Sequence, residues 1–146
     1  MVDGQLPPNA IIGGFEKDED IYVARAYHSG SLCPGKYVKS DGKAYVPWGG
    51  GEHIKEKDFE ILCGSNATWV KVDSAVIPEN AFIGGRTGGA EEVGGEPLYV
   101  GRAEVESGNL ICGKAYARTS LCYLPYYGRE IVTAVYEVLV VPEDEI

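Results

Sequence analysis

A lysine that recurs in both halves of the chain is the first residue that could do chemistry. Residues 25–36 read RAYHSGSLCPGK and residues 102–114 read RAEVESGNLICGK, so Lys36 and Lys114 both follow a glycine at the end of one repeated phrase. Because glycine permits tight turns and close backbone approach, each phrase is expected to end in a turn that presents a cation at the rim of the fold.

A glutamate beside a histidine is the second candidate. Residues 49–53 read GGGEH, and Glu52 recurs as Glu130, whereas His53 is replaced by Ile131. A polar side chain in a turn of this kind more often satisfies backbone donors than it does chemistry. The chain holds two histidines and no GxSxG element, which leaves little material for a catalytic triad. We therefore expect that the protein is not an enzyme.

The cysteines do not suggest a metal site. They form no CxxC pair, and two histidines add little to them. Free thiols in a reducing compartment, with no metal and no cofactor, are the expected state. Their positions are Cys33, Cys63, Cys112 and Cys122. Cys33 aligns with an isoleucine in the second half and Cys112 with a proline in the first, which favours a filling role.

The charge of the chain limits its partners. The 146 residues carry a net charge of −9, and both halves are acidic without a basic cluster, which argues against nucleic acid or an anionic membrane as a partner. No apolar run approaches the ~18 residues that a membrane span needs. The opening MVDGQLPPNA has no charged and apolar regions of a secretory signal. These features predict a cytoplasmic protein, and a role outside the cell would require non-classical secretion.

An internal repeat covers most of the chain. Five further segments recur in the same order, at offsets that drift from 70 to 78 residues. The pairs are VD (2–3) and VD (72–73), PPNAIIGG (7–14) and PENAFIGG (78–85), IYVARA (21–26) and LYVGRA (98–103), YVPWGGGE (45–52) and YLPYYGRE (123–130), and FEIL (59–62) and YEVL (136–139). We divide the chain into repeats at residues 1–70 and 71–146.

Both repeats have the pattern of strands. Several runs alternate along two faces and are rich in β-branched and aromatic residues, namely IYVARAYH (21–28), KAYVPW (43–48), LYVGRAEV (98–105) and TAVYEVLVV (133–141). Pro47 and Pro125 lie within strand-like runs, which predicts edge or bulged strands there. A unit of about 70 residues buries little alone. We therefore expect an all-β fold of antiparallel sheets, in which two tandem repeats share one core around a pseudo-two-fold axis.

The ordered motifs resemble a known family. The series PxNAIxGG, YVARA, PGK, AYVPxGGxEH and YE-V-L is similar to the tandem DM-nine repeat family. This family includes lectin-like proteins of invertebrates and the amino-terminal part of natterin-like proteins. The resemblance implies two intertwined all-β repeats. It also implies a protein that binds mannose-type glycans in innate immune pattern recognition, often as a homodimer.

The resemblance also implies a sugar site. In sugar-binding relatives an acidic residue after the GG-aromatic element and the lysine of the PGK turn contact the ligand, and here these positions hold Glu16 and Lys36. A carboxylate accepts hydrogen bonds from sugar hydroxyls and an ammonium donates to them. An aromatic neighbour such as Trp48 or Tyr22 could cover an apolar sugar face.

The second copy keeps only part of this pair. Lys114 is retained, but Thr87 stands where Glu16 stands in the first copy, and Glu91 and Glu92 in the enlarged loop are the acids that could replace it. We expect one good site and one weaker or inactive one.

Plainer interpretations stay open beside this one. Glu16 and Lys36 could form only a surface salt bridge, worth ~0–1 kcal/mol, and Trp48 and the tyrosines could be core residues. The repeated Arg25 and Arg102 are expected to pair with repeated acids such as Glu60 and Glu137. The alternative function is a cytosolic, non-lectin interaction protein, a stress- or vesicle-associated scaffold.

Overall fold

The computed structural model describes residues 6–72, 76–88 and 95–142, which form strands and no helix. The strands of the first repeat are β1 (Ile12–Glu16), β2 (Glu19–His28), β3 (Ser31–Val38), β4 (Lys43–Trp48), β5 (Gly51–Lys55), β6 (Phe59–Ile61) and β7 (Thr68–Lys71). Those of the second are β8 (Ile83–Arg86), β9 (Pro97–Glu104), β10 (Leu110–Tyr116), β11 (Leu121–Tyr126), β12 (Arg129–Thr133) and β13 (Glu137–Val140).

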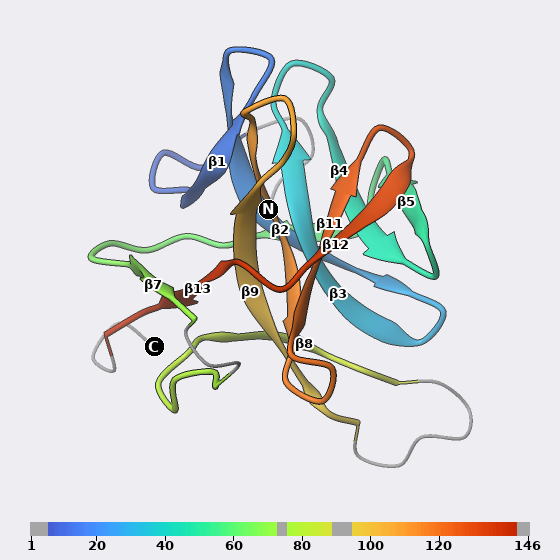
Figure 1. The fold of residues 1–146 in the computed structure, drawn as a ribbon. Helices are drawn as coiled ribbons and strands as arrows, with labels where there is room; N and C mark the ends of the chain where they lie inside the picture. The colour runs from blue at the N-terminus through green and yellow to red at the C-terminus, as the bar shows by residue number, and fades with distance from the viewer. Residues whose placement is uncertain (1–5, 73–75, 89–94, 143–146) are drawn as a thin grey trace.

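The strands form one sheet that closes on itself (Figure 1). Its order is β6-β2-β1-β10-β11-β12-β5-β4-β3-β8-β9-β13-β7, with additional pairings of β2 with β3 and of β9 with β10. Strands β1 to β6 correspond in order to β8 to β13. The all-β, antiparallel fold of two tandem repeats predicted from the sequence is confirmed.

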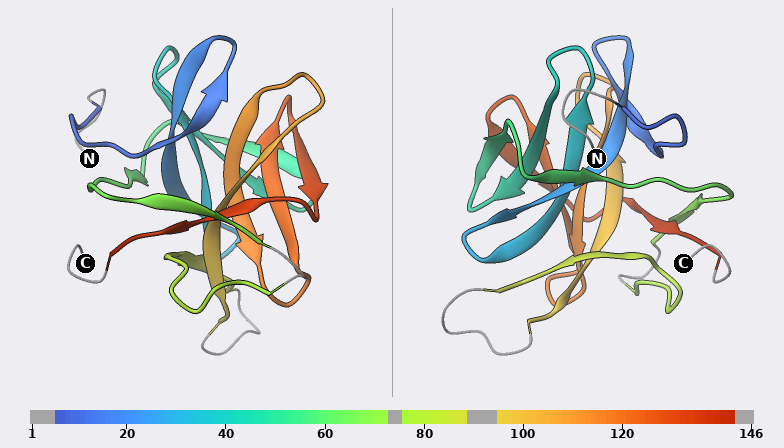
Figure 2. Two further views of the ribbon diagram at one scale, coloured as in Figure 1. Left: turned by 60° about the vertical axis from the view of Figure 1, so that its left-hand side comes forward. Right: turned by 180° about the vertical axis from the view of Figure 1, so that it is seen from behind.

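The first strand of each repeat pairs with its own second strand and also with a strand of the other repeat, a reciprocal contact that we call the exchange of first strands. β1 pairs with β10 at Phe15 and Leu110, and β8 pairs with β3 at Arg86 and Leu32. β5 and β12 meet where Gly51 faces Arg129, which are equivalent positions of the two repeats, so the pseudo-two-fold axis passes between these strands. Figure 2 shows the strands of the first repeat, blue to green, packed against those of the second, yellow to red.

The main core is built from both repeats. Its buried side chains include Ile21 and Val23 of β2 together with Val100, Ile111 and Leu124 of the second repeat. Smaller buried clusters lie within the first repeat. A shared core is the outcome expected for units that are too small to bury enough apolar surface alone. The division at residues 70 and 71 stays a prediction.

The expectation of edge strands at Pro47 and Pro125 was wrong. β4 and β11, which contain Pro47 and Pro125, are flanked on both sides and are not edge strands. The pairing of β4 with β3 ends at Tyr45, and that of β11 with β10 ends at Tyr123. Each proline therefore lies two residues beyond that ladder, where its missing N–H removes no bond of the ladder.

The run at residues 133–141 forms only a short strand. β12 ends at Thr133, whose hydroxyl accepts from the N–H of Val135 at 3.1 Å, and β13 begins only at Glu137. A side chain that bonds the backbone two residues on favours a turn over a strand. The chain uses this turn to leave β12 and reach β9.

The repeated glycine pair explains how the repeats approach each other. A Cβ atom on Gly14 would overlap the carbonyl oxygen of Leu110, and one on Gly85 would overlap the carbonyl oxygen of Leu32. Both obstacles are backbone atoms of the other repeat. The second glycine of each pair is therefore required by the exchange of first strands.

Replacing Gly14 or Gly85 by alanine should destabilise the fold by about 1–3 kcal/mol, as expected when a packed backbone must shift. Urea unfolding of each variant measures this loss. The matched control is Gly51→Ala, because a Cβ there would meet the His53 side chain at 3.4 Å and the carbonyl oxygen of Trp48 at 3.9 Å, without overlap. An equal loss in all three variants would contradict the account.

Candidate functional site

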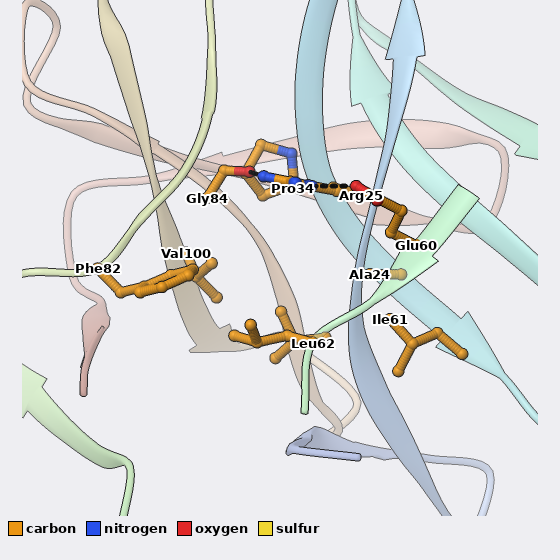
Figure 3. Close-up of a pocket in the computed structure, with 10 residues that line it drawn as sticks. Ala24, Arg25, Pro34, Glu60, Ile61, Leu62, Phe82, Gly84 and Val100 are labelled. Atoms are coloured by element: carbon orange, nitrogen blue, oxygen red, sulfur yellow. Dashed lines mark hydrogen bonds and ion pairs between the residues drawn. The ribbon is translucent and has the colours of Figure 1, made fainter. Parts of the chain in front are cut away.

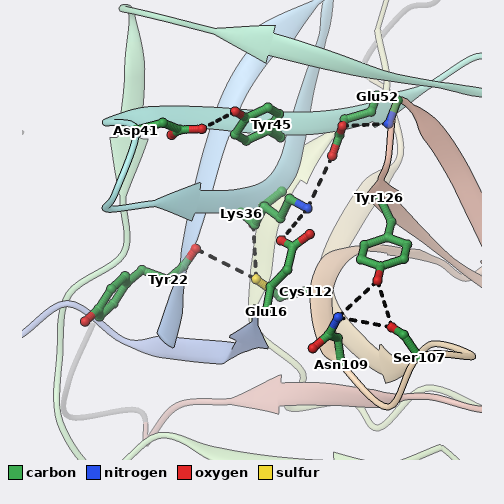
Figure 4. A network of polar contacts seen from close by, with 12 residues as sticks. Glu16, Tyr22, Lys36, Asp41, Tyr45, Glu52, Ser107, Asn109, Cys112 and Tyr126 are labelled. Atoms are coloured by element: carbon green, nitrogen blue, oxygen red, sulfur yellow. Dashed lines mark hydrogen bonds and ion pairs between the residues drawn. The ribbon is translucent and has the colours of Figure 1, made fainter. Parts of the chain in front are cut away.

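Lys36 projects from β3 into a cluster of carboxylates and aromatic rings (Figure 4). Its Nζ lies 2.8 Å from Glu16 Oε1 and 3.2 Å from Glu52 Oε2. The same Nζ is 5.5 Å from the ring centroids of both Tyr45 and Tyr126. Lys36 is only 2% exposed. Since a buried ammonium needs charged partners, these side chains form one electrostatic unit, which we call the Lys36 cluster.

Local structure places the acid and the base of this cluster. Glu16 is the last residue of β1 and pairs with Glu19 across a two-residue turn. The turn residues, Lys17 and Asp18, have φ angles of 52° and 63°, as expected for the primed turns that join twisted strands. Lys36 lies on the adjacent part of the sheet, because β2 pairs with both β1 and β3.

Glu52 serves both repeats at once. While Oε2 contacts Lys36, Oε1 accepts a 2.8 Å hydrogen bond from the N–H of Gly128, in the turn of the second repeat. Reciprocally, Glu130 Oε1 accepts from the N–H of Gly50 at 3.0 Å. The repeated glutamate therefore satisfies backbone donors, as the sequence suggested, and the donors belong to the other repeat.

The rims of the cluster are fixed by further hydrogen bonds. The Tyr45 hydroxyl donates to Asp41 Oδ2, and burial together with this bond raises the pKa of Tyr45 above its usual range. The Tyr126 hydroxyl lies 2.7 Å from Ser107 Oγ and accepts from Asn109 Nδ2 at 3.0 Å. The hydrogen bond with Ser107 is the main cause that lowers the pKa of Tyr126.

An open pocket of about 180 Å³ lies over the Lys36 cluster. It is lined by Glu16, Lys17, Glu19, Lys36, Val38, Ser40, Asp41, Tyr45, Glu52 and Tyr127. Four of these residues are acidic and two are lysines, so the pocket is acidic and rich in hydrogen-bond acceptors. Tyr127 at its edge is 65% exposed, and Lys17 Nζ lies 5.6 Å from its ring centroid.

A second pocket occupies the equivalent place in the other repeat. Lys114 Nζ lies 3.7 Å from Glu130 Oε2 and 5.5 Å from the ring centroid of Tyr123. Thr87 lines this pocket, but its hydroxyl accepts from the N–H of Glu96 at 2.8 Å and so holds its own loop. The second lysine thus has one carboxylate where the first has two.

Each pocket takes an aromatic side chain from the opposite repeat. Trp48 of the first repeat is 39% exposed and lines the pocket of Lys114, whereas Tyr126 and Tyr127 of the second repeat lie at that of Lys36. Tyr22 lines neither pocket; it faces a separate groove beside the amino-terminal segment. The suggestion that Trp48 or Tyr22 lies next to Lys36 was therefore wrong.

Two histidines flank the second pocket. The rings of His28 and His53 are stacked with centroids 3.9 Å apart, and His28 also lies 5.4 Å from Trp48. Lys55 Nζ donates to His28 Nδ1 at 3.0 Å. Burial, and then the nearby charges of His53 and Lys55, lower the pKa of His28. Because the lowered pKa favours the neutral ring, His28 accepts this hydrogen bond, and the positive charge beside it is that of Lys55.

The four cysteines are free thiols in the structure. Cys63 is exposed and the other three are buried. Burial raises the pKa of Cys112 to about 12 and also raises the pKa values of Cys33 and Cys122. Protonated, buried thiols are inert, which agrees with a filling role.

Several predicted contacts are present. Arg25 Nε lies 2.7 Å from Glu60 Oε1, and the equivalent Arg102 lies 2.7 Å from Glu137, so the repeated ion pairs are confirmed.

Glu91 and Glu92 lie outside the described residues. No cluster of potential ligands in the described part of the chain is arranged to hold a metal ion. Within that part there is also no helix long and apolar enough to cross a membrane.

Glu52 is the member of the cluster that sequence reasoning missed as a partner of Lys36. The signal was present, because the lysine and the glutamate both recur at the same offset, as Lys114 and Glu130. No sequence pattern pointed to Tyr126, because it belongs to the second repeat and lies near Lys36 only where the two repeats pack together.

The fold and these two related pockets define a tandem-repeat protein with a shared core. The sequence profile of the DM9 repeat matches residues 16–94 and 92–146. The chain therefore belongs to the DM9 repeat family, as the sequence motifs predicted.

One solved structure extends the comparison. The crystal structure of the nematode sperm cell motility protein MFP2B superimposes with a TM-score of 0.66 at 23% identity and covers 94% of this chain. The chain spans 44% of that protein's length. At this identity the likeness shows the fold alone. Among curated proteins, no sequence matches.

The burial of Lys36 predicts a large effect on stability. Lys36→Met should lower the free energy of unfolding by about 3–5 kcal/mol, because it leaves Glu16 and Glu52 buried without a counter-ion. Lys39 is exposed, so Lys39→Met is the matched control and should change stability little. The measurement is urea unfolding at neutral pH, and a Lys36 variant as stable as its control would contradict the assignment.

Proposed function

We propose that this protein is a carbohydrate-binding lectin and that the pocket over the Lys36 cluster is its sugar site. The observation that carries the proposal is the carboxylate of Glu16, which Lys36 holds at 2.8 Å beside an open pocket lined with acceptors. A hexose offers adjacent hydroxyl groups that donate to carboxylates. The ring of Tyr127 offers a face for the apolar side of a sugar.

The burial of Lys36 changes the role we propose for it. With 2% exposure, its ammonium offers a ligand little direct surface while it contacts both glutamates. We therefore assign Lys36 to holding the carboxylates in place and Glu16 to the contact with sugar. Lys114 has a longer contact with its acid, at 3.7 Å, and is proposed as the ligand contact of a weaker second pocket.

The finer features of the function rest on the family. The DM9 family includes mannose-binding lectin-like proteins, which supports mannose-type glycans as ligands and innate immune pattern recognition as the setting. A single polar site binds weakly, and a homodimer or a second pocket would raise avidity by ~10²–10⁴ where geometry permits. No catalytic role is proposed for either pocket.

The test is calorimetric titration with α-methyl mannoside. Glu16→Gln should lower the affinity about tenfold, because a charge-assisted hydrogen bond to the sugar, worth ~1.5–3 kcal/mol, is weakened. Its amide oxygen can still accept from Lys36, so the fold should be retained, as urea unfolding would verify. Glu104 is an exposed acid outside the pocket, so Glu104→Gln is the matched control and should bind as the parent does.

Two results would contradict the proposal. One is a folded Glu16→Gln variant with unchanged affinity, which would remove Glu16 from the site. The other is the lack of binding to any common monosaccharide at millimolar concentration, which would favour the non-lectin interaction protein. The variant Lys114→Met separates the pockets, because a weaker second site should leave the tighter binding event intact.

A further inference from the structure

One edge of the sheet is covered in the second repeat and open in the first. β13 pairs with β9 on one side and with β7 on the other. Its counterpart β6 pairs with β2, and among the described residues no strand pairs with its other side. Figure 1 shows β7 lying alongside β13.

The contacts of β7 show which side chains fit against this edge of the sheet. Trp69 lies opposite Leu139 of β13, and its ring centroid is 4.2 Å from Cζ of Arg102. Arg102 in turn contacts Glu137, which faces Lys71 of β7. Residues that are opposite one another or two apart share one face of a sheet. The aromatic ring, the arginine and the ion pair are therefore one layered contact.

The equivalent surface of the first repeat, formed by β2 and β6, has no strand like β7 beside it among the described residues. Arg25 and Glu60 form the same 2.7 Å contact, but their side chains are 39% and 64% exposed, whereas those of Arg102 and Glu137 are 20% and 38% exposed. The two apolar residues that follow each of these glutamates also differ in exposure between the repeats. Ile61 and Leu62 are partly exposed, and their equivalents Val138 and Leu139 are buried.

A pocket marks the place that Trp69 fills in the other repeat (Figure 3). It has a volume of about 170 Å³, and Leu62, Phe82 and Val100 form its apolar wall. Arg25 borders it and is held by Glu60 and by a 3.1 Å hydrogen bond to the carbonyl of Gly84. An aromatic ring placed here would stack on a guanidinium that is already fixed.

The backbone of β6 is oriented to accept another strand. The N–H of Leu62 donates to the carbonyl of Val23 at 3.0 Å, and its carbonyl accepts from the N–H of Ile11 at 2.9 Å. Because backbone groups alternate along a strand, the N–H and C=O of Ile61 point away from β2, towards the outer side.

We propose that β6 binds an extended peptide of a partner protein as an added antiparallel strand. The register of β7 on β13 defines the peptide: an aromatic residue opposite Leu62, an apolar residue opposite Ile61 and a basic residue opposite Glu60. Strand addition of this kind takes affinity from main-chain bonds and specificity from side-chain pockets. β7 of this chain is already engaged at β13 and is not available to β6, and the occupant that we propose is a segment of a partner protein.

The site is independent of the proposed sugar pocket. The two pockets share no lining residue, so either can fail experimentally without the other. The net charge of −9 favours a basic partner segment.

The probe is a blocked synthetic peptide with the sequence of residues 66–72, NATWVKV, titrated into the intact chain. The readout is amide hydrogen exchange by NMR. Saturable binding should slow exchange of the Ile61 amide at least tenfold, since that N–H gains a main-chain bond. A peptide with alanine for tryptophan should bind about five-fold more weakly, the factor of one cation–π contact.

Arg25→Ala should weaken peptide binding by the same factor. Arg118 is 70% exposed and pairs with Glu96 instead, so Arg118→Ala is its control and should bind normally. The proposal is overturned if no binding occurs at millimolar peptide or if the bound peptide leaves the Ile61 amide unprotected. Protection of this amide without peptide would also overturn it, because the occupant would then be a second copy if the protection depends on protein concentration, or another segment of this chain if it does not.

Discussion

The structure depends on two glutamates that are each shared between the repeats. Glu52 contacts Lys36 of its own repeat and the backbone N–H of Gly128 in the other, and Glu130 makes the reciprocal bond to Gly50. Each carboxylate thus neutralises a lysine and fixes the opposite turn. A buried carboxylate that lost either partner would carry a large desolvation cost. The two repeats are therefore held in one register about the axis between β5 and β12.

The same exchange builds both pockets. The turn that Glu52 fixes carries Tyr127, which lines the first pocket, and the turn that Glu130 fixes carries Gly49, next to Trp48 in the second. A single repeat would supply a lysine, an acid and one tyrosine ring, Tyr45 or Tyr123, without the aromatic side chain of the other repeat. Binding and folding consequently rest on the same contacts, which is why removal of Lys36 is a poor test of ligand binding alone.

Much of the fold could be predicted because the chain repeats its own sequence. The alternation of side chains fixed the strands, and the recurrence of Arg25 with Glu60 indicated a contact that the structure shows at 2.7 Å. The exchange of strands could not be predicted, because pairing between β1 and β10 leaves no mark in either segment alone. For that reason Trp48 was placed beside the wrong lysine. No sequence pattern shows that β7 pairs with β13 of the other repeat, so the open edge of β6 among the described residues became visible only in the structure.

The central claim is that neither repeat forms this fold alone. The direct measurement is to prepare residues 1–73 and 74–146 as separate chains and to record near-UV circular dichroism and urea unfolding for each chain and for their mixture. The account predicts that each half lacks native tertiary structure and a cooperative transition, and that mixing restores both. A half that unfolds cooperatively by itself, with a native near-UV spectrum, would contradict it.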